Sequence, residues 1–187
     1  LDVEASGNIS TSSASTVTIN SGSVRLNSTS GTMTVGANIA APGPISLLGN
    51  TVTVSGNVIA SSAGQGILIK SKGNIAVSAN KTIQTAGGSA ATLVFWAGST
   101  GSSGTVDFGD GVCINTQNGC ASALETGGAN IYVGGGSSGT AYPTGNITGS
   151  GNGIQIGTST GSKKFYSAGG DIAVSYTHLT LPTTPYV

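Results

Sequence analysis

Pairs of apolar residues with a single residue between them recur along most of this chain, and they restrict the folds available to it. Clear examples are Val24 with Leu26 and Ile67 with Ile69. Alternation with period two over four or five residues is typical of a half-buried β-strand, because successive side chains point to opposite faces. Helical spacing is absent, so we expect an all-β fold with almost no helix.

A recurring tripeptide precedes many of these pairs: a small residue, then Asn or Asp, then Ile or Val. It occurs seven times, with central residues Asn8, Asn38, Asn57, Asn74, Asn130, Asn146 and Asp171. Apart from the long stretch between Asn74 and Asn130, the copies form an irregular repeat of near twenty residues. Gly and Asn tolerate left-handed backbone conformations, so we expect the tripeptide to turn the chain before a strand. We expect its Ile or Val to point inward.

Strands this short, each with only two inward residues, favour a parallel β-solenoid over a sandwich or a barrel. A coil of about twenty residues, built from two or three strands, would stack on the next coil at the ~4.8 Å spacing of neighbouring strands. We therefore predict a β-solenoid over residues 1–173, with about seven or eight short coils. Neither end resembles a cap, so we expect an uncapped fragment of a longer repeat.

Composition argues against several classes of function. Gly, Ser, Thr and Asn make up 96 of the 187 residues, only 6% are charged, and the formal net charge is zero. A nucleic-acid-binding protein needs a clustered basic footprint, which this chain lacks. No apolar run approaches the ~18 residues expected of a membrane span. We expect neither nucleic acid as a partner nor a membrane span.

The last residues differ from the rest of the chain. Glycine stops after Gly170, and two prolines and the single histidine, His178, follow. Residues 174–183 (VSYTHLTLPT) resemble the translation of a transposase-type sequencing adapter. We therefore expect residues 174–187 to be a non-native, unstructured tail, and we assign no function to His178.

The most specific resemblance to a known family lies in residues 92–174. There the segments TLVFW (92–96), TVDF (105–108), GVCI (111–114), GGANIYVGGG (127–136), GIQI (153–156) and AGGDIAV (168–174) follow one another. This pattern resembles the β-strand-repeat regions of filamentous-haemagglutinin-like exoproteins, in which a glycine-rich turn-and-strand unit follows an apolar strand ending near Trp. The resemblance extends more weakly over most of residues 1–173.

The resemblance implies a right-handed β-helix and a structural, non-enzymatic role. Members of this family are very large secreted or surface-attached proteins of Gram-negative bacteria that serve in adhesion or contact between cells. It implies secretion through an outer-membrane partner and contacts with host or neighbouring cell-surface glycans or proteins. We thus expect a stalk segment of a bacterial adhesin, located outside the cell or on its surface, with no cofactor and no metal.

Cys113 and Cys120 are the only cysteines, and a short turn-like segment lies between them. The intervening Asn and Gly residues allow a tight excursion, so we predict a structural disulfide in an exported protein. Two free or buried thiols are the alternative. A metal site would need further Cys or His residues.

A carbohydrate-active β-helix enzyme, similar to a polysaccharide lyase or hydrolase, is the first alternative function. Asp107 and Asp110 form an acidic pair close in sequence, and catalysis would require further ionisable groups near them. Alternation places Asp107 outward and Asp110 in a turn, so we interpret both as solvated. Trp96 ends the most apolar run, and we expect it to be covered rather than open to a sugar.

An ice-binding solenoid is the second alternative function. It would need a flat, outward ladder of threonines in regular register. Thr-x-Thr pairs at positions 16/18, 32/34 and 51/53 indicate such a ladder, but the irregular intervals of the repeat weaken it.

Overall fold

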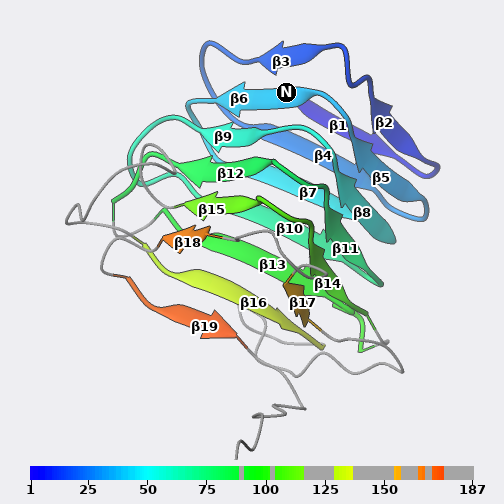
Figure 1. The fold of residues 1–187 in the computed structure, drawn as a ribbon. Helices are drawn as coiled ribbons and strands as arrows, with labels where there is room; N and C mark the ends of the chain where they lie inside the picture. Colours follow the sequence, from blue (N-terminus) through cyan, green and yellow to red (C-terminus); the bar gives the residue numbers. More distant parts are fainter. Residues whose placement is uncertain are drawn as a thin grey trace, which may run out of the picture.

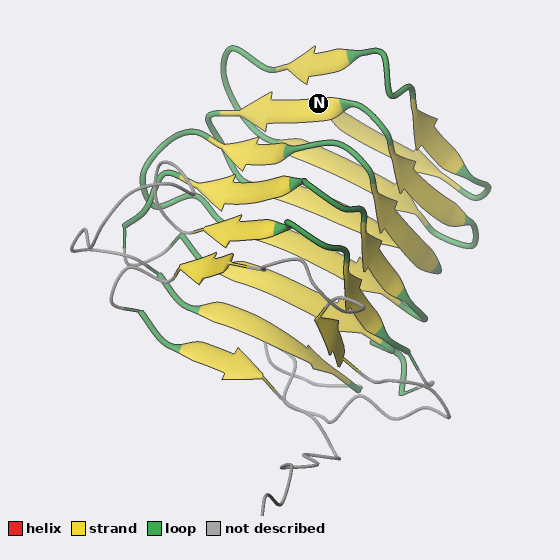
Figure 2. Cartoon of the chain, in the orientation of Figure 1, coloured by secondary structure: helices red, strands yellow, loops and turns green. Residues whose placement is uncertain are grey.

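The chain winds into a parallel β-solenoid (Figure 1). The computed structural model describes residues 1–88, 91–101, 104–115, 129–136, 154–156, 164–166 and 170–174. These residues form nineteen strands and no helix (Figure 2). Every strand pairs with its neighbours in parallel, as in β1 with β4 and β4 with β7. The predicted all-β solenoid is confirmed.

Three sheets run along the solenoid, and each coil contributes one strand to each of them. Sheet A contains β1 (Asp2–Ala5), β4 (Val24–Ser28), β7 (Ile45–Gly49), β10 (Ile67–Ser71), β13 (Leu93–Ala97), β16 (Ile131–Gly135) and β19 (Ile172–Val174). Sheet B contains β2 (Ile9–Thr11), β5 (Thr32–Val35), β8 (Thr51–Val54), β11 (Ile75–Val77), β14 (Val106–Phe108) and β17 (Ile154–Ile156). Sheet C contains β3 (Thr16–Thr18), β6 (Asn38–Ala41), β9 (Val58–Ala60), β12 (Thr82–Thr85), β15 (Cys113–Asn115) and β18 (Lys164–Tyr166).

The described strands make six complete coils and the first strand of a seventh, fewer than the seven or eight coils expected. The coils lengthen along the chain. Val24 and Ile45, which are register partners in two early coils of sheet A, lie close to twenty positions apart in sequence. Val133 and Val174, which are register partners near the other end of the sheet, lie about twice as far apart. The expected coil of about twenty residues thus holds only for the first part of the solenoid.

The core consists of columns of apolar side chains, one from each coil. In sheet B, for example, Met33, Val52 and Ile75 occupy successive coils and are fully buried. Burial of one such side chain is worth about 1.5–3 kcal/mol relative to its exposure. In the fifth coil the rings of Phe95 and Phe108 meet edge to face across the interior, with centroids 5.0 Å apart. Alternation in the sequence therefore predicts the inward positions correctly.

The corner between sheets A and B is lined by small residues. Ser28, Gly49 and Ser71 follow one another in the last inward position of sheet A. The hydroxyl of Ser28 donates to the carbonyl of Gly7 at 2.7 Å, and that of Ser71 donates to the carbonyl of Asn50 at 2.7 Å. Among the described residues, no buried polar side-chain atom lacks a hydrogen-bond partner.

The asparagines of the recurring tripeptide join each coil to the next. The Oδ1 atom of Asn38 accepts a hydrogen bond from the backbone N–H of Asn57 at 2.9 Å. Asn57 in turn accepts from the N–H of Thr82 at 3.0 Å. These bonds run along the entrance to sheet C, and so they extend the backbone ladder by one position beyond the strands.

The same bond occurs at the entrances to the other two sheets. The Oδ1 atoms of Asn8, Asn74 and Asn130 accept hydrogen bonds from the backbone N–H groups of Thr32, Thr105 and Asp171, respectively, with N···O distances of 2.8–3.0 Å. The tripeptide therefore marks three different corners of the coil. That distribution, together with the changing coil length, explains its irregular spacing in the sequence.

In the described copies, the tripeptide turns the chain at the start of a strand, as expected, but without the left-handed conformation that Gly and Asn tolerate. Among the described residues, Asn80 is the one non-glycine residue with positive φ, and the glycines with positive φ lie outside the tripeptides. The small residue is needed for close stacking instead. A Cβ on Gly56 would overlap the carbonyl of Ala37 in the preceding coil, and one on Gly170 would lie 2.6 Å from the carbonyl of Ala129.

We predict that Gly56→Ala destabilises the solenoid by about 1–3 kcal/mol, because the added methyl group forces two coils apart. Gly7→Ala is the matched control, since this glycine belongs to the same motif but nothing lies within 4 Å of the position that its methyl group would take. Urea unfolding of the two variants measures the difference. Equal losses of stability would contradict the stacking argument.

We predict that Asn57→Ala costs about 1–2 kcal/mol, because it leaves the N–H of Thr82 without its acceptor. Hydrogen exchange at the Thr82 amide should accelerate relative to the parent chain. Asn20→Ala, at an exposed turn, is the control and should change neither quantity. Unchanged exchange at Thr82 would show that the asparagine side chain does not hold the coils together.

Candidate functional site

The outer face of sheet A carries charged, polar and apolar side chains. Strand register places one outward residue of each coil in a single column across this face. In chain order the column consists of Glu4, Asn27, Leu48, Lys70, Trp96 and Gly134. These residues are widely separated in sequence, yet each is the neighbour of the next in space.

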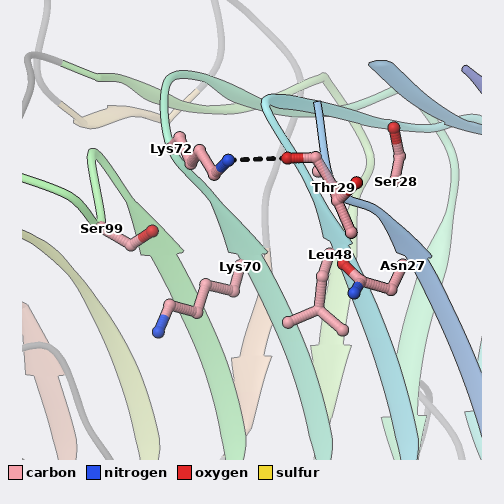
Figure 3. A pocket seen from close by; sticks show the side chains of 8 residues that line it. Asn27, Ser28, Thr29, Leu48, Lys70, Lys72 and Ser99 are labelled. Carbon is pink, nitrogen blue, oxygen red and sulfur yellow. Dashed lines mark hydrogen bonds between the residues drawn. The ribbon is translucent and has the colours of Figure 1, made fainter. Parts of the chain in front are cut away.

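A shallow cavity of about 110 Å³ lies over the middle of this column (Figure 3). Leu48 lies between Lys70 and Asn27 in this view and supplies its apolar surface. Thr29, Lys72 and Ser99 add polar groups from the turns that follow β4, β10 and β13. None of the described residues that line the cavity carries a carboxylate.

Lys72 spans a whole coil at the edge of the cavity. Its Nζ atom donates a hydrogen bond to the carbonyl of Thr29 at 2.7 Å (Figure 3). Thr29 belongs to the second coil and Lys72 to the fourth, so the lysine side chain passes over the third coil near Leu48. This contact fixes a positive charge beside the apolar floor.

Lys70 lies on the other side of the floor and contacts Trp96. Its Nζ atom is 4.0 Å from the centre of the Trp96 ring, within the range of a cation–π interaction. Trp96 is only 3% exposed, although it faces outward in the strand, and its indole N–H donates to the carbonyl of Gly136 at 2.7 Å. The expectation that Trp96 is covered is confirmed.

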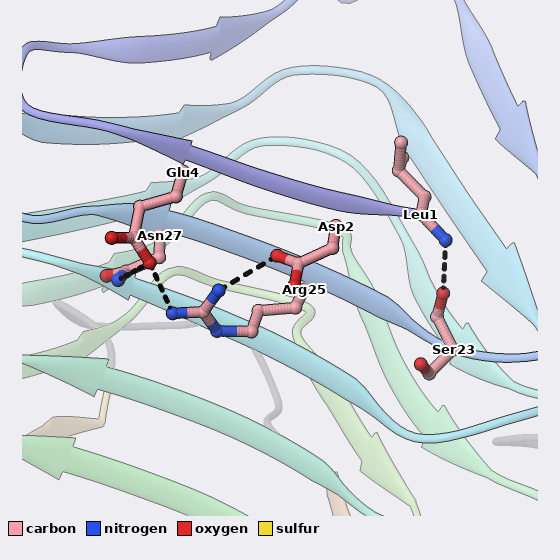
Figure 4. Close-up of polar contacts among 6 residues, drawn as sticks. All are labelled: Leu1, Asp2, Glu4, Ser23, Arg25 and Asn27. Carbon is pink, nitrogen blue, oxygen red and sulfur yellow. Dashed lines mark hydrogen bonds and ion pairs between the residues drawn. The ribbon is translucent and has the colours of Figure 1, made fainter.

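An exposed ion-pair cluster lies on the first two coils of this face (Figure 4), and Asn27 belongs both to this cluster and to the cavity lining. Arg25 bonds Asp2 at 2.9 Å and Glu4 at 2.6 Å, and the amide of Asn27 donates to the same Glu4 oxygen at 3.0 Å. The hydrogen bond from Arg25 is the main reason why the pKa of Glu4 is lowered, followed by the bond from Asn27. The pKa of Arg25 is raised by its bonds to Glu4 and Asp2.

Asp107 and Asp110 lie away from this face. Asp107 points outward from β14 in sheet B, where its register partners are Ala76 and Gln155. Asp110 lies in the following turn, and its carbonyl accepts a hydrogen bond from the N–H of Asn80 at 2.8 Å. In the described part of the chain, no group of three His, Cys, Asp or Glu residues is placed to hold a metal ion.

Cys113 begins β15 and is 6% exposed. It is a bonded cysteine rather than a free thiol. Its predicted partner, Cys120, lies outside the described residues, so the pairing of Cys113 with Cys120 stays a prediction.

The threonine pairs are divided between two sheets. Thr32 and Thr34 pair in register with Thr51 and Thr53 on the outer face of sheet B. The ladder is short, because the register partner of Thr34 in the preceding coil is Ser10 and that of Thr53 in the next coil is Ala76. The pair at 16/18 lies in sheet C. The threonine ladder required for ice binding thus extends over two adjacent coils.

The cavity has no local signal in the sequence that would identify it. Lys70 and Lys72 lie two residues apart in IKSK, which is a weak signal by itself. Their meeting with Asn27 and Leu48 depends on which residues of successive coils are in register. That register follows from the length of each coil, which varies along the chain and which the sequence pattern does not determine.

Comparisons with models of protein families, with curated proteins and with solved structures found no match. In the described ranges, no helix is long and apolar enough to cross a membrane.

We predict that Arg25→Gln raises the pKa of Glu4 toward its ordinary value, because the strongest hydrogen bond to the carboxylate is lost. Since the folded-state pKa of Glu4 is lowered, this contact stabilises the fold above the unfolded pKa and is lost as the pH falls through the folded pKa. NMR titration of the Glu4 carboxyl carbon measures the change. Asn27→Ala should produce a smaller shift, and an unchanged pKa in Arg25→Gln would refute the assignment.

Proposed function

We propose that this chain is a stalk segment of a large secreted or surface-attached bacterial adhesin of the filamentous-haemagglutinin-like kind. It would mediate contact between a cell and a surface or between cells. The observation that supports this proposal best is the regular architecture: parallel coils continue without change of topology over every described strand. Such a structure lengthens by adding coils, each contributing about 4.8 Å.

The distribution of polar and apolar residues suits a stalk. In the described part of the chain, aliphatic columns with Phe95 and Phe108 fill the interior, so each coil holds the next through burial as well as through backbone hydrogen bonds. The exterior is hydrated by Ser, Thr and Asn with few charges. A rod of this kind resists bending because every coil is bonded to its neighbours across all three sheets.

The outer faces also suit multivalent contact. One side chain per coil stands in each outward column, so a face presents a row of groups at the spacing of neighbouring strands. Many weak contacts along such a row bind tightly when they are made together. Glycans or proteins of host or neighbouring cells would be the partners, and an outer-membrane protein would export the chain.

Fab fragments raised against residues 1–173 test the location and the role of the segment. On intact cells of the source bacterium we expect surface labelling that external protease removes, and we expect the Fab to reduce attachment or aggregation of the cells. A Fab against a cytosolic chaperone is the control and should label only permeabilised cells. Labelling by the solenoid Fab only after permeabilisation would overturn the proposal.

A further inference from the structure

We propose that the cavity on the outer face of sheet A binds an acidic sugar residue, a uronic acid within a polysaccharide. The inference rests on the proposed function, because it names a ligand class for a contact site on the stalk. Lys70 binds the carboxylate, the C–H face of the sugar ring lies on Leu48, and hydroxyls of this sugar or of its neighbours in the polymer meet Asn27 and Ser99.

The charges around the cavity favour an anionic group. Among the described residues that line it, two are lysines and none is acidic. The ammonium group of Lys70 rests on the ring of Trp96, and the described residues place no carboxylate within ion-pair distance of it. Glu4, at the near end of the column, is already bonded to Arg25 and Asn27. A carboxylate entering from solvent therefore meets the positive charge of Lys70.

The remaining surface favours a sugar over a bare phosphate. Phosphate sites in proteins are typically formed by converging backbone N–H groups. Here the N–H groups of Thr29, Lys72 and Ser99 donate to the carbonyls of Ala5, Gly49 and Ser71, over 2.9–3.0 Å. The coil-to-coil ladder thus uses those donors, and the cavity offers side chains instead.

Leu48 gives the cavity an apolar floor, which a phosphate does not need and a pyranose ring can cover. Asn27 and Ser99 lie on opposite sides of it and carry amide or hydroxyl groups that suit sugar hydroxyls (Figure 3). The volume of about 110 Å³ is that of roughly three or four waters, so the cavity holds part of one ring. Binding at one site is accordingly weak, and strength comes from repetition along the polymer.

Trp96 provides a direct readout because it is the only tryptophan and it contacts Lys70. We expect trigalacturonate to change its fluorescence in a saturable manner when added to the whole chain. The methyl-esterified trisaccharide has the same rings without the charges and should bind at least tenfold more weakly. Ligand-observed saturation-transfer NMR gives an independent measure, since substitutions near Trp96 alter its emission by themselves.

Three variants locate the site. Lys70→Gln should weaken binding about tenfold by removing the charge, and Leu48→Asn should weaken it by removing the apolar floor. Lys81→Gln is the matched control, because Lys81 precedes β12 in sheet C and lies outside the cavity lining. Circular dichroism and thermal unfolding verify that each variant is folded.

Four results would overturn the proposal: no binding of trigalacturonate, equal binding of its methyl ester, equal loss of binding in Lys81→Gln, or tighter binding of triglutamate or inorganic phosphate. The third would indicate non-specific attraction to lysines, and the last would assign the cavity to a peptide or a phosphate. Each measurement uses the purified chain, so it is independent of where the protein resides. If the Fab labels the cell surface but the purified chain does not bind uronates, the stalk proposal stands and the proposed ligand class is wrong.

Discussion

The parallel hydrogen-bond ladder between successive coils is the interaction on which the rest of the structure depends. Each coil can bond to the next in all three sheets only if both have the same cross-section. In the early coils the inward positions hold side chains of similar size, as Val35, Val54 and Val77 do in sheet B, and the longer fifth coil places Phe108 next in that column. Where the chain turns, the backbones of two coils still approach closely, and glycine at position 56 permits this. The asparagines continue the same ladder through their side chains, because an amide oxygen accepts the hydrogen bond from a backbone N–H of the next coil.

Because the strands stay short while the turns vary in length, the outward columns of side chains stay aligned. The coils become about twice as long from one end of the solenoid to the other, while the strands of sheet A stay short throughout. Added residues are therefore accommodated between strands, and the columns on each face stay aligned. Residues as distant in sequence as Asn27 and Trp96 then belong to one outward column. The cavity beside Leu48 is a product of this alignment.

Local signals in the sequence are sufficient for the class of fold. The alternation of Val24 with Leu26 predicts an inward pair in a short strand, and both residues are buried. The tripeptides predict where strands begin, as at Ile75 and Ile131. The small first residue of the tripeptide is needed for close stacking, because at Gly56 the requirement is for space between coils rather than for positive φ. The cavity requires knowledge of the register, since only the register joins Lys70 to Leu48 and Trp96. Cys113 is a bonded cysteine, but Cys120 lies outside the described residues, so the pairing of the two remains a prediction.

Distances between spin labels along one outward column of sheet B measure the stacking of the coils. Labels carried by a non-cysteine amino acid at positions 10 and 76 should be separated by three coil spacings, about 14 Å, and labels at 10 and 107 by four spacings, about 19 Å. Stacked parallel coils predict that the distance between the two labels grows by one strand spacing per coil, whatever the number of residues between the labelled positions. A separation that does not increase from the first pair to the second would contradict the stacked parallel coils.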